Sequence, residues 1–207
     1  MAVVSNGTTL IDAGALSVGS GSLTLIKTLT ASASGTLDFV DGASDVVLDD
    51  TYDEYVFKFI NIHPAGSGDT GAQFSFNLSV DAGSNYDVAK TTTWFESSHR
   101  ENDSGGALGY NANRDLAQGT GFLQLSDNFD SHANDYNLGG YMHLFAPSST
   151  TFVKHFTAVT NFTNSDYIFN AYVGGYGNTT SAVDAVQFKF STGNIDAGSI
   201  KLYGVGG

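Results

Sequence analysis

Hydrophobic and polar residues alternate along most of this chain, and a period of two is the pattern of β-strands that bury one face. The clearest case is the segment EYVFKFINI, residues 54–62. Its aromatic side chains fall on one face, and the intervening residues fall on the other. The aromatic face comprises Tyr55, Phe57 and Phe59, and the opposite face comprises Val56, Lys58 and Ile60. The pattern predicts a strand whose aromatic face points into a core.

A second strand is predicted at QFSFNLSV, residues 73–80, where the alternation is complete. Its apolar positions are Phe74, Phe76, Leu78 and Val80, and its polar positions are Gln73, Ser75, Asn77 and Ser79. We expect the apolar positions to point inward and the polar positions to face solvent, as in an antiparallel sheet with one wet face.

Further apolar runs are separated by turns rich in Gly, Asn and Asp, and together they predict roughly ten or eleven short strands. These runs are residues 23–30, 36–40, 89–97, 121–126, 139–146, 152–162 and 167–176, followed by a final pair. No segment shows a sustained helical period, and no internal repeat is present. The sequence therefore predicts an all-β fold, an antiparallel jelly-roll-like β-sandwich.

The final pair consists of VQFKFS, residues 186–191, and SIKLYGV, residues 199–205. The intervening TGNIDAG contains residues that tolerate tight turns, so we expect the two strands to form a closing hairpin.

The first 22 residues differ from the rest because they are small and polar and end in GSGS, a flexible-linker composition. We predict two parts, an N-terminal attachment arm at residues 1–22 and a β-sandwich domain at residues 23–207. Leu10, Ile11 and Leu16 are the candidate attachment residues, because a tail without a partner has no use for large aliphatic side chains. A frayed terminus is the alternative.

The composition favours strands and turns over helices. Charged residues make up 14% of the chain, against about 25% in typical globular proteins. The formal net charge is −13, from 8 Lys and Arg against 21 Asp and Glu. Such an acidic chain lacks the clustered cations that bind nucleic acid or an anionic membrane surface, so we expect neither as a partner.

Several kinds of site are not expected. The chain has no cysteine, which excludes disulfides, zinc fingers and thiol nucleophiles. The first residues do not read as a secretory signal, and no run approaches the roughly 20 apolar residues of a membrane helix. No catalytic motif is present, and we predict no cofactor and no metal.

The longest stretch without clear periodicity is residues 97–120, SSHRENDSGGALGYNANRDLAQGT, which carries both arginines of the chain. We expect a loop at the exposed end of the sandwich, where long loops commonly carry function. Arg100, Tyr110 and Arg114 are the candidate receptor contacts. The alternative is that this loop packs against a neighbouring subunit.

The sequence also contains candidate residues for three further chemistries, namely saccharide contact, glycoside hydrolysis and calcium binding. Trp94, Phe95, Tyr110 and Tyr136 lie in or beside predicted loops and would suit a saccharide, although aromatic residues are more often core. Glycoside hydrolysis needs two facing carboxylates, and the candidates are Glu54, Glu96 and Glu101. The Asp- and Asn-rich segments ENDSGG and DNFDSHANDYN offer oxygen ligands for calcium, but these are also ordinary turn residues.

The chain contains four long motifs, which are DDTYDEYVFKFINIHPA (Asp49–Ala65), ENDSGGALGY (Glu101–Tyr110), LFAPSSTTFVKHF (Leu144–Phe156) and FKFSTGNIDAGSIKLYGV (Phe188–Val205). Together these motifs resemble a family of structural proteins common in phages of marine bacteria, cyanobacteria among their hosts. The resemblance runs from about Leu23 to the C-terminus and rests on structural rather than catalytic signatures.

The resemblance implies a non-enzymatic virion protein, made in the host cytoplasm and located in the phage particle. A tail-fibre, spike or receptor-binding component is the first expectation, and a capsid decoration or head-fibre protein is the alternative. A polysaccharide-degrading spike is a minor alternative. Expected partners are further copies of the chain in a homotrimer, other tail or capsid proteins, and a host surface glycan or protein.

Overall fold

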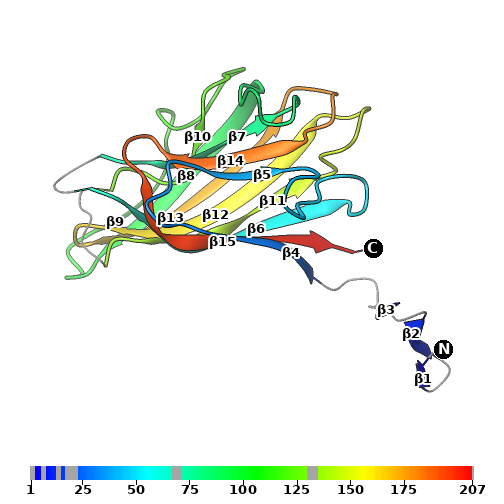
Figure 1. Ribbon diagram of the computed structural model, residues 1–207. Helices are drawn as coiled ribbons and strands as arrows, with labels where there is room; N and C mark the ends of the chain where they lie inside the picture. Colours follow the sequence, from blue (N-terminus) through cyan, green and yellow to red (C-terminus); the bar gives the residue numbers. More distant parts are fainter. Residues whose placement is uncertain are drawn as a thin grey trace.

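A computed structural model describes residues 3–5, 8–12, 15–16, 23–66, 71–129 and 135–206. The described part of the chain contains no helix, and its two larger sheets pack face to face as a β-sandwich (Figure 1). Every strand pair in these sheets is antiparallel. The all-β sandwich expected from the sequence is confirmed.

The sheets are unequal in width. In spatial order, the wide sheet contains β4 (Leu23–Thr30), β15 (Ile195–Val205), β6 (Glu54–Pro64), β11 (Leu138–Phe145), β12 (Lys154–Asn164), β13 (Tyr167–Gly177), β8 (Lys90–Arg100) and β9 (Gly106–Tyr110). The narrow sheet contains β10 (Leu123–Gln124), β7 (Phe74–Ser79), β14 (Ala185–Phe190) and β5 (Leu37–Val40). A jelly roll consists of eight strands in two sheets, whereas these two sheets contain twelve strands. The jelly-roll topology therefore stays a prediction.

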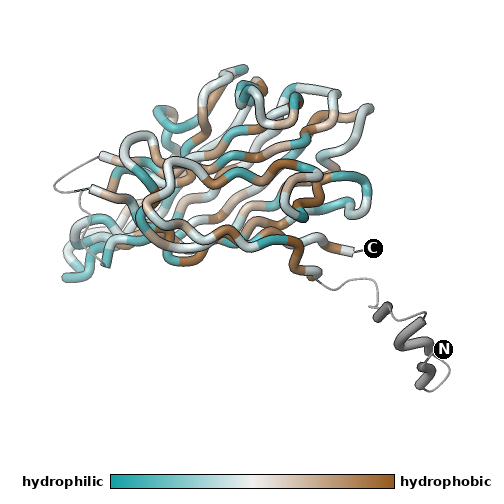
Figure 2. The backbone as a smooth tube through the Cα atoms, viewed as in Figure 1, coloured by the Kyte–Doolittle hydropathy of each residue, from teal (hydrophilic) through white to brown (hydrophobic). Residues whose placement is uncertain are grey.

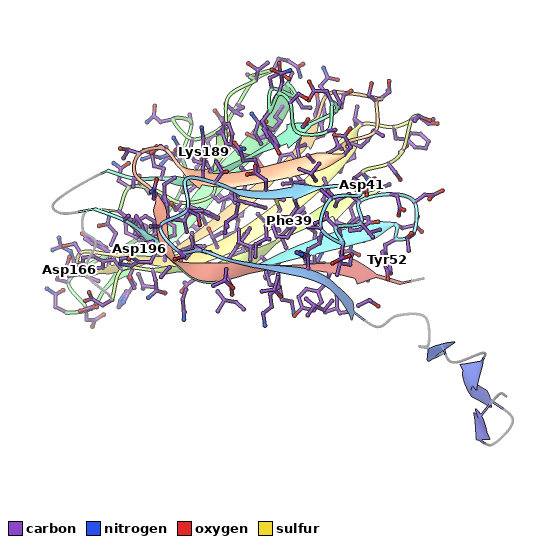
Figure 3. All side chains as sticks on the ribbon, in the orientation of Figure 1. Phe39, Asp41, Tyr52, Asp166, Lys189 and Asp196 are labelled. Atoms are coloured by element: carbon purple, nitrogen blue, oxygen red, sulfur yellow. The ribbon has the colours of Figure 1, made fainter. Side chains whose placement is uncertain are left out.

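An aromatic core fills the space between the sheets, where Phe39 is visible in Figure 3. Phe188 of β14 lies at its centre, with no exposed surface. The hydropathy colouring of Figure 2 alternates along the strands, as expected for elements with one buried face. The prediction for β6 is confirmed, because Tyr55, Phe57 and Phe59 are buried whereas Ile60 is 39% exposed.

The prediction for β7 is only half right. Its apolar residues Phe74, Phe76 and Leu78 are fully buried, but Val80 lies beyond the strand and is 39% exposed. The polar face expected in solvent is also buried, since the exposed fractions of Ser75, Asn77 and Ser79 do not exceed 2%. The reason lies in the tertiary structure. The loop before β8 and the loop after β9 both fold over this face of β7.

Asn77 forms the hydrogen bonds that hold these loops against β7. Its side-chain amide donates hydrogen bonds to the backbone carbonyls of Tyr86 (2.5 Å) and Thr120 (2.9 Å). Its side-chain oxygen accepts from the ammonium of Lys90, which also donates to the carbonyl of Val88 at 2.7 Å. A lysine with no exposed surface is therefore held by neutral oxygens.

The burial of Lys90 predicts an unusual dependence of stability on pH. Desolvation lowers the pKa of Lys90 to about 8, against about 10.4 in the unfolded chain. Between these values the unfolded state binds more protons, so the free energy of unfolding rises with pH. We expect the free energy of unfolding of the native chain to rise by about 2 kcal/mol from pH 7 to 9.5, relative to that of the Lys90→Met variant. Urea unfolding of both proteins across this range measures the gain, and parallel pH profiles would contradict it.

The closing hairpin expected at the C-terminal end is wrong. β14 pairs with β7 and β5 in the narrow sheet, whereas β15 pairs with β4 and β6 in the wide sheet. Four residues, 191–194, cross between the sheets, and an extended chain of that length spans about 13 Å, enough for sheets about 10 Å apart. Alternation in both strands shows that each buries one face, but it does not say in which sheet.

The loop expected at residues 97–120 is also partly wrong. β8 continues to Arg100, and β9 returns along it from Gly106 to Tyr110, so this region begins as a β-hairpin at the edge of the wide sheet. The rest of it follows β8, with the amide of Thr92 donating to the carbonyl of Leu116 at 2.9 Å. The many Gly, Asn and Asp residues hide the strand period.

The N-terminal arm contains three short strands, β1 (Val3–Ser5), β2 (Thr8–Asp12) and β3 (Ala15–Leu16), which pair with one another as a separate sheet. In this sheet Ile11 is the register partner of Leu16, and Leu10 lies in β2. The side chains of these three candidate attachment residues lie outside the described part of the structure.

Candidate binding surface

The outer face of the wide sheet is the most distinctive surface of the sandwich. One register row crosses all eight strands and changes from aromatic to cationic along its length. From β9 to β4, the row consists of Tyr110, Phe95, Tyr172, Val159, Tyr141, Lys58, Lys201 and Thr28. Directly opposed residues share one face of a sheet, so this row places three aromatic side chains beside one another at the β9 end.

Phe95 and Tyr172 form a stacked pair within that row. Their ring centroids lie 5.0 Å apart, and their planes differ by 9°. Phe95 is 41% exposed and Tyr172 is 38% exposed, so the pair stands on the surface rather than in the core. The offset-stacked arrangement is a favourable geometry for aromatic rings, and it holds the two side chains in a fixed position.

A second row runs parallel to the aromatic row, two residues further along each strand. From β9 to β11 it consists of Leu108, Ser97, Asn170, Asn161 and Gly139. The amide of Asn161 donates to the carbonyl of Phe169 at 3.1 Å. The side chains of Ser97 and Asn170 make no hydrogen bond to another residue in the described part of the chain.

Two hollows lie over these rows. One, of about 440 Å³, is lined mainly by Ser97, His99, Asn161, Ile168 and Asn170, and the other, of about 260 Å³, by Thr93, Phe95, Thr157, Val159, Tyr172 and Gly174. We call these outer-face residues of β8, β12 and β13 the trough. The trough contains no Asp, Glu, Lys or Arg, although the whole chain carries a net charge of −13.

The structure does not bring the three predicted receptor contacts together. Tyr110 lies at the rim of the trough, 57% exposed, with its hydroxyl donating to Asp115. Arg100 lies at the other end of the β8–β9 hairpin, five residues beyond the register partner of Tyr110, which is about 17 Å away along the strand. There its guanidinium lies 4.5 Å from the ring centroid of Tyr167 and forms an ion pair with Asp166 at 3.5 Å.

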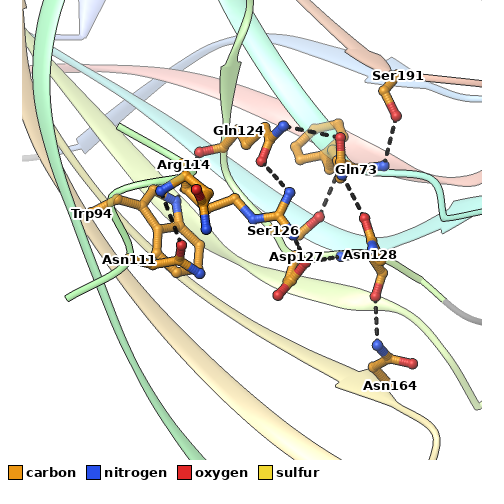
Figure 4. A network of polar contacts seen from close by, with 12 residues as sticks. Gln73, Trp94, Asn111, Arg114, Gln124, Ser126, Asp127, Asn128, Asn164 and Ser191 are labelled. Atoms are coloured by element: carbon orange, nitrogen blue, oxygen red, sulfur yellow. Dashed lines mark hydrogen bonds and ion pairs between the residues drawn. The ribbon is translucent and has the colours of Figure 1, made fainter. Parts of the chain in front are cut away.

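Arg114 is part of an internal network instead of a binding surface. Figure 4 shows its guanidinium between Gln124 and Asp127. It donates to the side-chain oxygen of Gln124 at 2.6 Å, forms an ion pair with Asp127, and has a side chain only 14% exposed. The network continues from Gln124 to Gln73 of the segment before β7, so Arg114 ties the chain after β9 to the narrow sheet.

The four aromatic candidates for saccharide contact divide into two groups. Phe95 and Tyr110 are exposed at the trough. Trp94 is fully buried, with its indole N–H donating to the carbonyl of Gln124 at 3.0 Å, and Tyr136 packs against the core. Sequence analysis missed Tyr172, Asn161 and Asn170. The alternation in YIFNAYVGGY is the signal that could have found Tyr172 and Asn170, since it puts both on the face opposite Phe169 and Ala171.

The predicted carboxylates do not form a hydrolytic pair. Glu54 and Glu96 lie on β6 and β8, four strand positions apart, which is at least about 19 Å, and a glycosidase pair lies within about 10 Å. Glu54 pairs with His143 on the outer face, whereas burial, with a smaller contribution from Asp127, raises the pKa of Glu96. Glu101 is exposed in the β8–β9 turn.

No group of three or more His, Asp or Glu side chains suited to a metal ion occurs among the described residues. Part of the second calcium candidate, residues 130–134, lies outside them. The described residues also include no helix with the length and apolar character needed to span a membrane.

Comparison with protein-family models, with curated proteins and with solved structures found no match to this chain.

Proposed function

We propose that this chain is a non-enzymatic structural protein of a bacteriophage particle, and that it acts as a tail-fibre, spike or receptor-binding component. The observation that supports this role is the difference between the two outer faces of the sandwich. Loops bury the polar face of β7 in the narrow sheet, whereas the wide sheet exposes Phe95, Tyr110, Tyr141 and Tyr172. A contiguous exposed aromatic patch is characteristic of an interaction surface.

The edge strand β4, which follows the arm in the chain, is a candidate surface for contact between copies of the protein. Leu23 and Leu25 of the edge strand β4 are 46% and 52% exposed, and among the described strands β4 pairs with β15 alone. An unpaired edge with exposed leucines is suited to contact with another copy of the chain. We propose a homotrimer assembled at this edge, with the arm attached to the particle. Light scattering should give three times the 21.7 kDa of the single chain, and a single-chain mass throughout the micromolar range would contradict the trimer.

The position of the protein in the particle tests the proposed function. Antibodies raised against the purified chain should label the tails of purified particles of the phage that encodes it, and mass spectrometry of those particles should detect the chain. Labelling over the capsid would instead identify a decoration or head-fibre protein. Particles that lack the chain altogether would contradict a structural role in the virion.

A further inference from the structure

We propose that the trough on the outer face of β8, β12 and β13 binds an uncharged saccharide. The inference deepens the receptor-binding function proposed above, on which it rests for its biological meaning, by naming the surface and the class of ligand. Three properties of the trough carry it, namely its aromatic pair, its unused polar groups and its lack of charge.

The aromatic pair supplies an apolar platform. A pyranose ring has a face of C–H groups that packs against an aromatic side chain, which combines apolar burial with a polar rim. The hollow of about 260 Å³ lies beside Phe95 and Tyr172 and is also lined by Gly174. Gly174 follows Tyr172 on the same face of β13, and because it has no side chain the space next to the ring pair stays open.

The second row supplies hydrogen-bonding groups at the other side of the platform. Ser97 and Asn170 are register partners whose side chains have no partner in the described structure. Asn161 is directly opposite Asn170 and uses its amide nitrogen but not its side-chain oxygen. Sugar hydroxyls both donate and accept, and Ser and Asn side chains can match both roles. The two rows lie about 7 Å apart along the strands, so one sugar ring can contact both.

The charge of the trough restricts the ligand class. The lining contains no Asp, Glu, Lys or Arg, and the imidazole of its histidine, His99, already faces the carboxylate of Asp103 at 3.1 Å, so the lining offers no unpaired cation to a sulfate, phosphate or uronate group. The net charge of −13 would also repel an anionic polysaccharide. The larger hollow, at about 440 Å³, falls within the range of about 300–1,000 Å³ found for small-molecule sites. These properties favour a neutral glycan over a charged one.

The test uses the full-length purified chain and defined glycans. An array of neutral hexasaccharides, namely of α- and β-linked glucose, mannose, galactose and xylose, would be probed beside heparin and oligoalginate. Isothermal titration calorimetry would then follow the strongest neutral ligand. We expect binding to at least one neutral glycan and none to the two anionic probes at physiological salt.

Three variants assign binding to the trough. Tyr172→Ala removes one ring of the pair, and Asn170→Asp places a carboxylate among the polar groups. Each is expected to weaken the affinity by on the order of tenfold or more. Phe145→Ala is the matched control, because Phe145 is 37% exposed on the outer face of the same sheet but lies on β11 and does not line either hollow of the trough. It should bind as the native chain does. Circular dichroism would verify that all three remain folded.

Three results would overturn the proposal. The first is the absence of binding to every neutral glycan at millimolar concentration, and the second is binding that survives both trough substitutions. The third is a native oligomer that Tyr172→Ala converts to a smaller species in sedimentation analysis, because a second copy of the chain would then cover the trough. None of these results bears on whether the chain is in the virion, which mass spectrometry of the particles decides separately.

Discussion

Replacing Phe188 with alanine is expected to lower the free energy of unfolding by about 3–5 kcal/mol, the range found for large aromatic residues in cores. Phe188 packs against five rings, with centroid distances of 5.3–6.2 Å. These rings come from β5, β6 and β7 and therefore from both sheets. The substitution would leave a cavity at the point where the two sheets meet, and urea unfolding monitored by tryptophan fluorescence would measure the loss.

Phe152→Ala is the control for this experiment, because it deletes the same side chain from the surface. Phe152 is 71% exposed in the turn before β12, and its removal should change the unfolding free energy by no more than about 0.5 kcal/mol. A similar loss in the two variants would show that Phe188 does not hold the sheets together.

Gly140→Ala is the second substitution expected to be strongly destabilising, by about 3 kcal/mol, because strained backbone and overpacking each contribute about 1–3 kcal/mol. Gly140 has φ of +151°, at the point in β11 where the register with β6 shifts. A Cβ there would lie 2.3 Å from the carbonyl oxygen of Val159 and 2.8 Å from the Cα of Thr160. Both are backbone atoms of β12, so neither can rotate away.

The adjacent glycine provides the control. A Cβ on Gly139 would meet its nearest atom, the carbonyl oxygen of Phe59, at 3.9 Å, an ordinary contact. Since alanine is less flexible than glycine in the unfolded chain, Gly139→Ala should be neutral or stabilising by up to about 1 kcal/mol. Thermal and urea unfolding of the two variants would compare them, and equal stability would contradict the close approach of β11 and β12 at Gly140.

Local alternation was sufficient to predict the buried aromatic face of β6 and the three buried apolar residues within β7, because side chains of a strand alternate whatever the strand pairs with. It did not show that β7 ends before Val80. The same reasoning failed for the other face of β7. Whether Asn77 meets water depends on the loops that carry Tyr86 and Thr120, and no local pattern states where a loop folds. A buried Lys90 is unpredictable for the same reason.

Composition and alternation alone determined that this protein is an all-β sandwich with an acidic surface and a distinct N-terminal segment, because these properties depend on neighbouring residues and on totals. Only the tertiary structure decided that β14 and β15 lie in different sheets. It also decided that the side chain of Arg114 is largely buried whereas Tyr110 is exposed, and that Phe95 stacks on Tyr172. Arg114 lies 10 and 13 positions from its partners Gln124 and Asp127, and Phe95 lies 77 positions from Tyr172. Their contacts arise from strand order and register, which are set by long-range pairing that a single sequence does not encode locally.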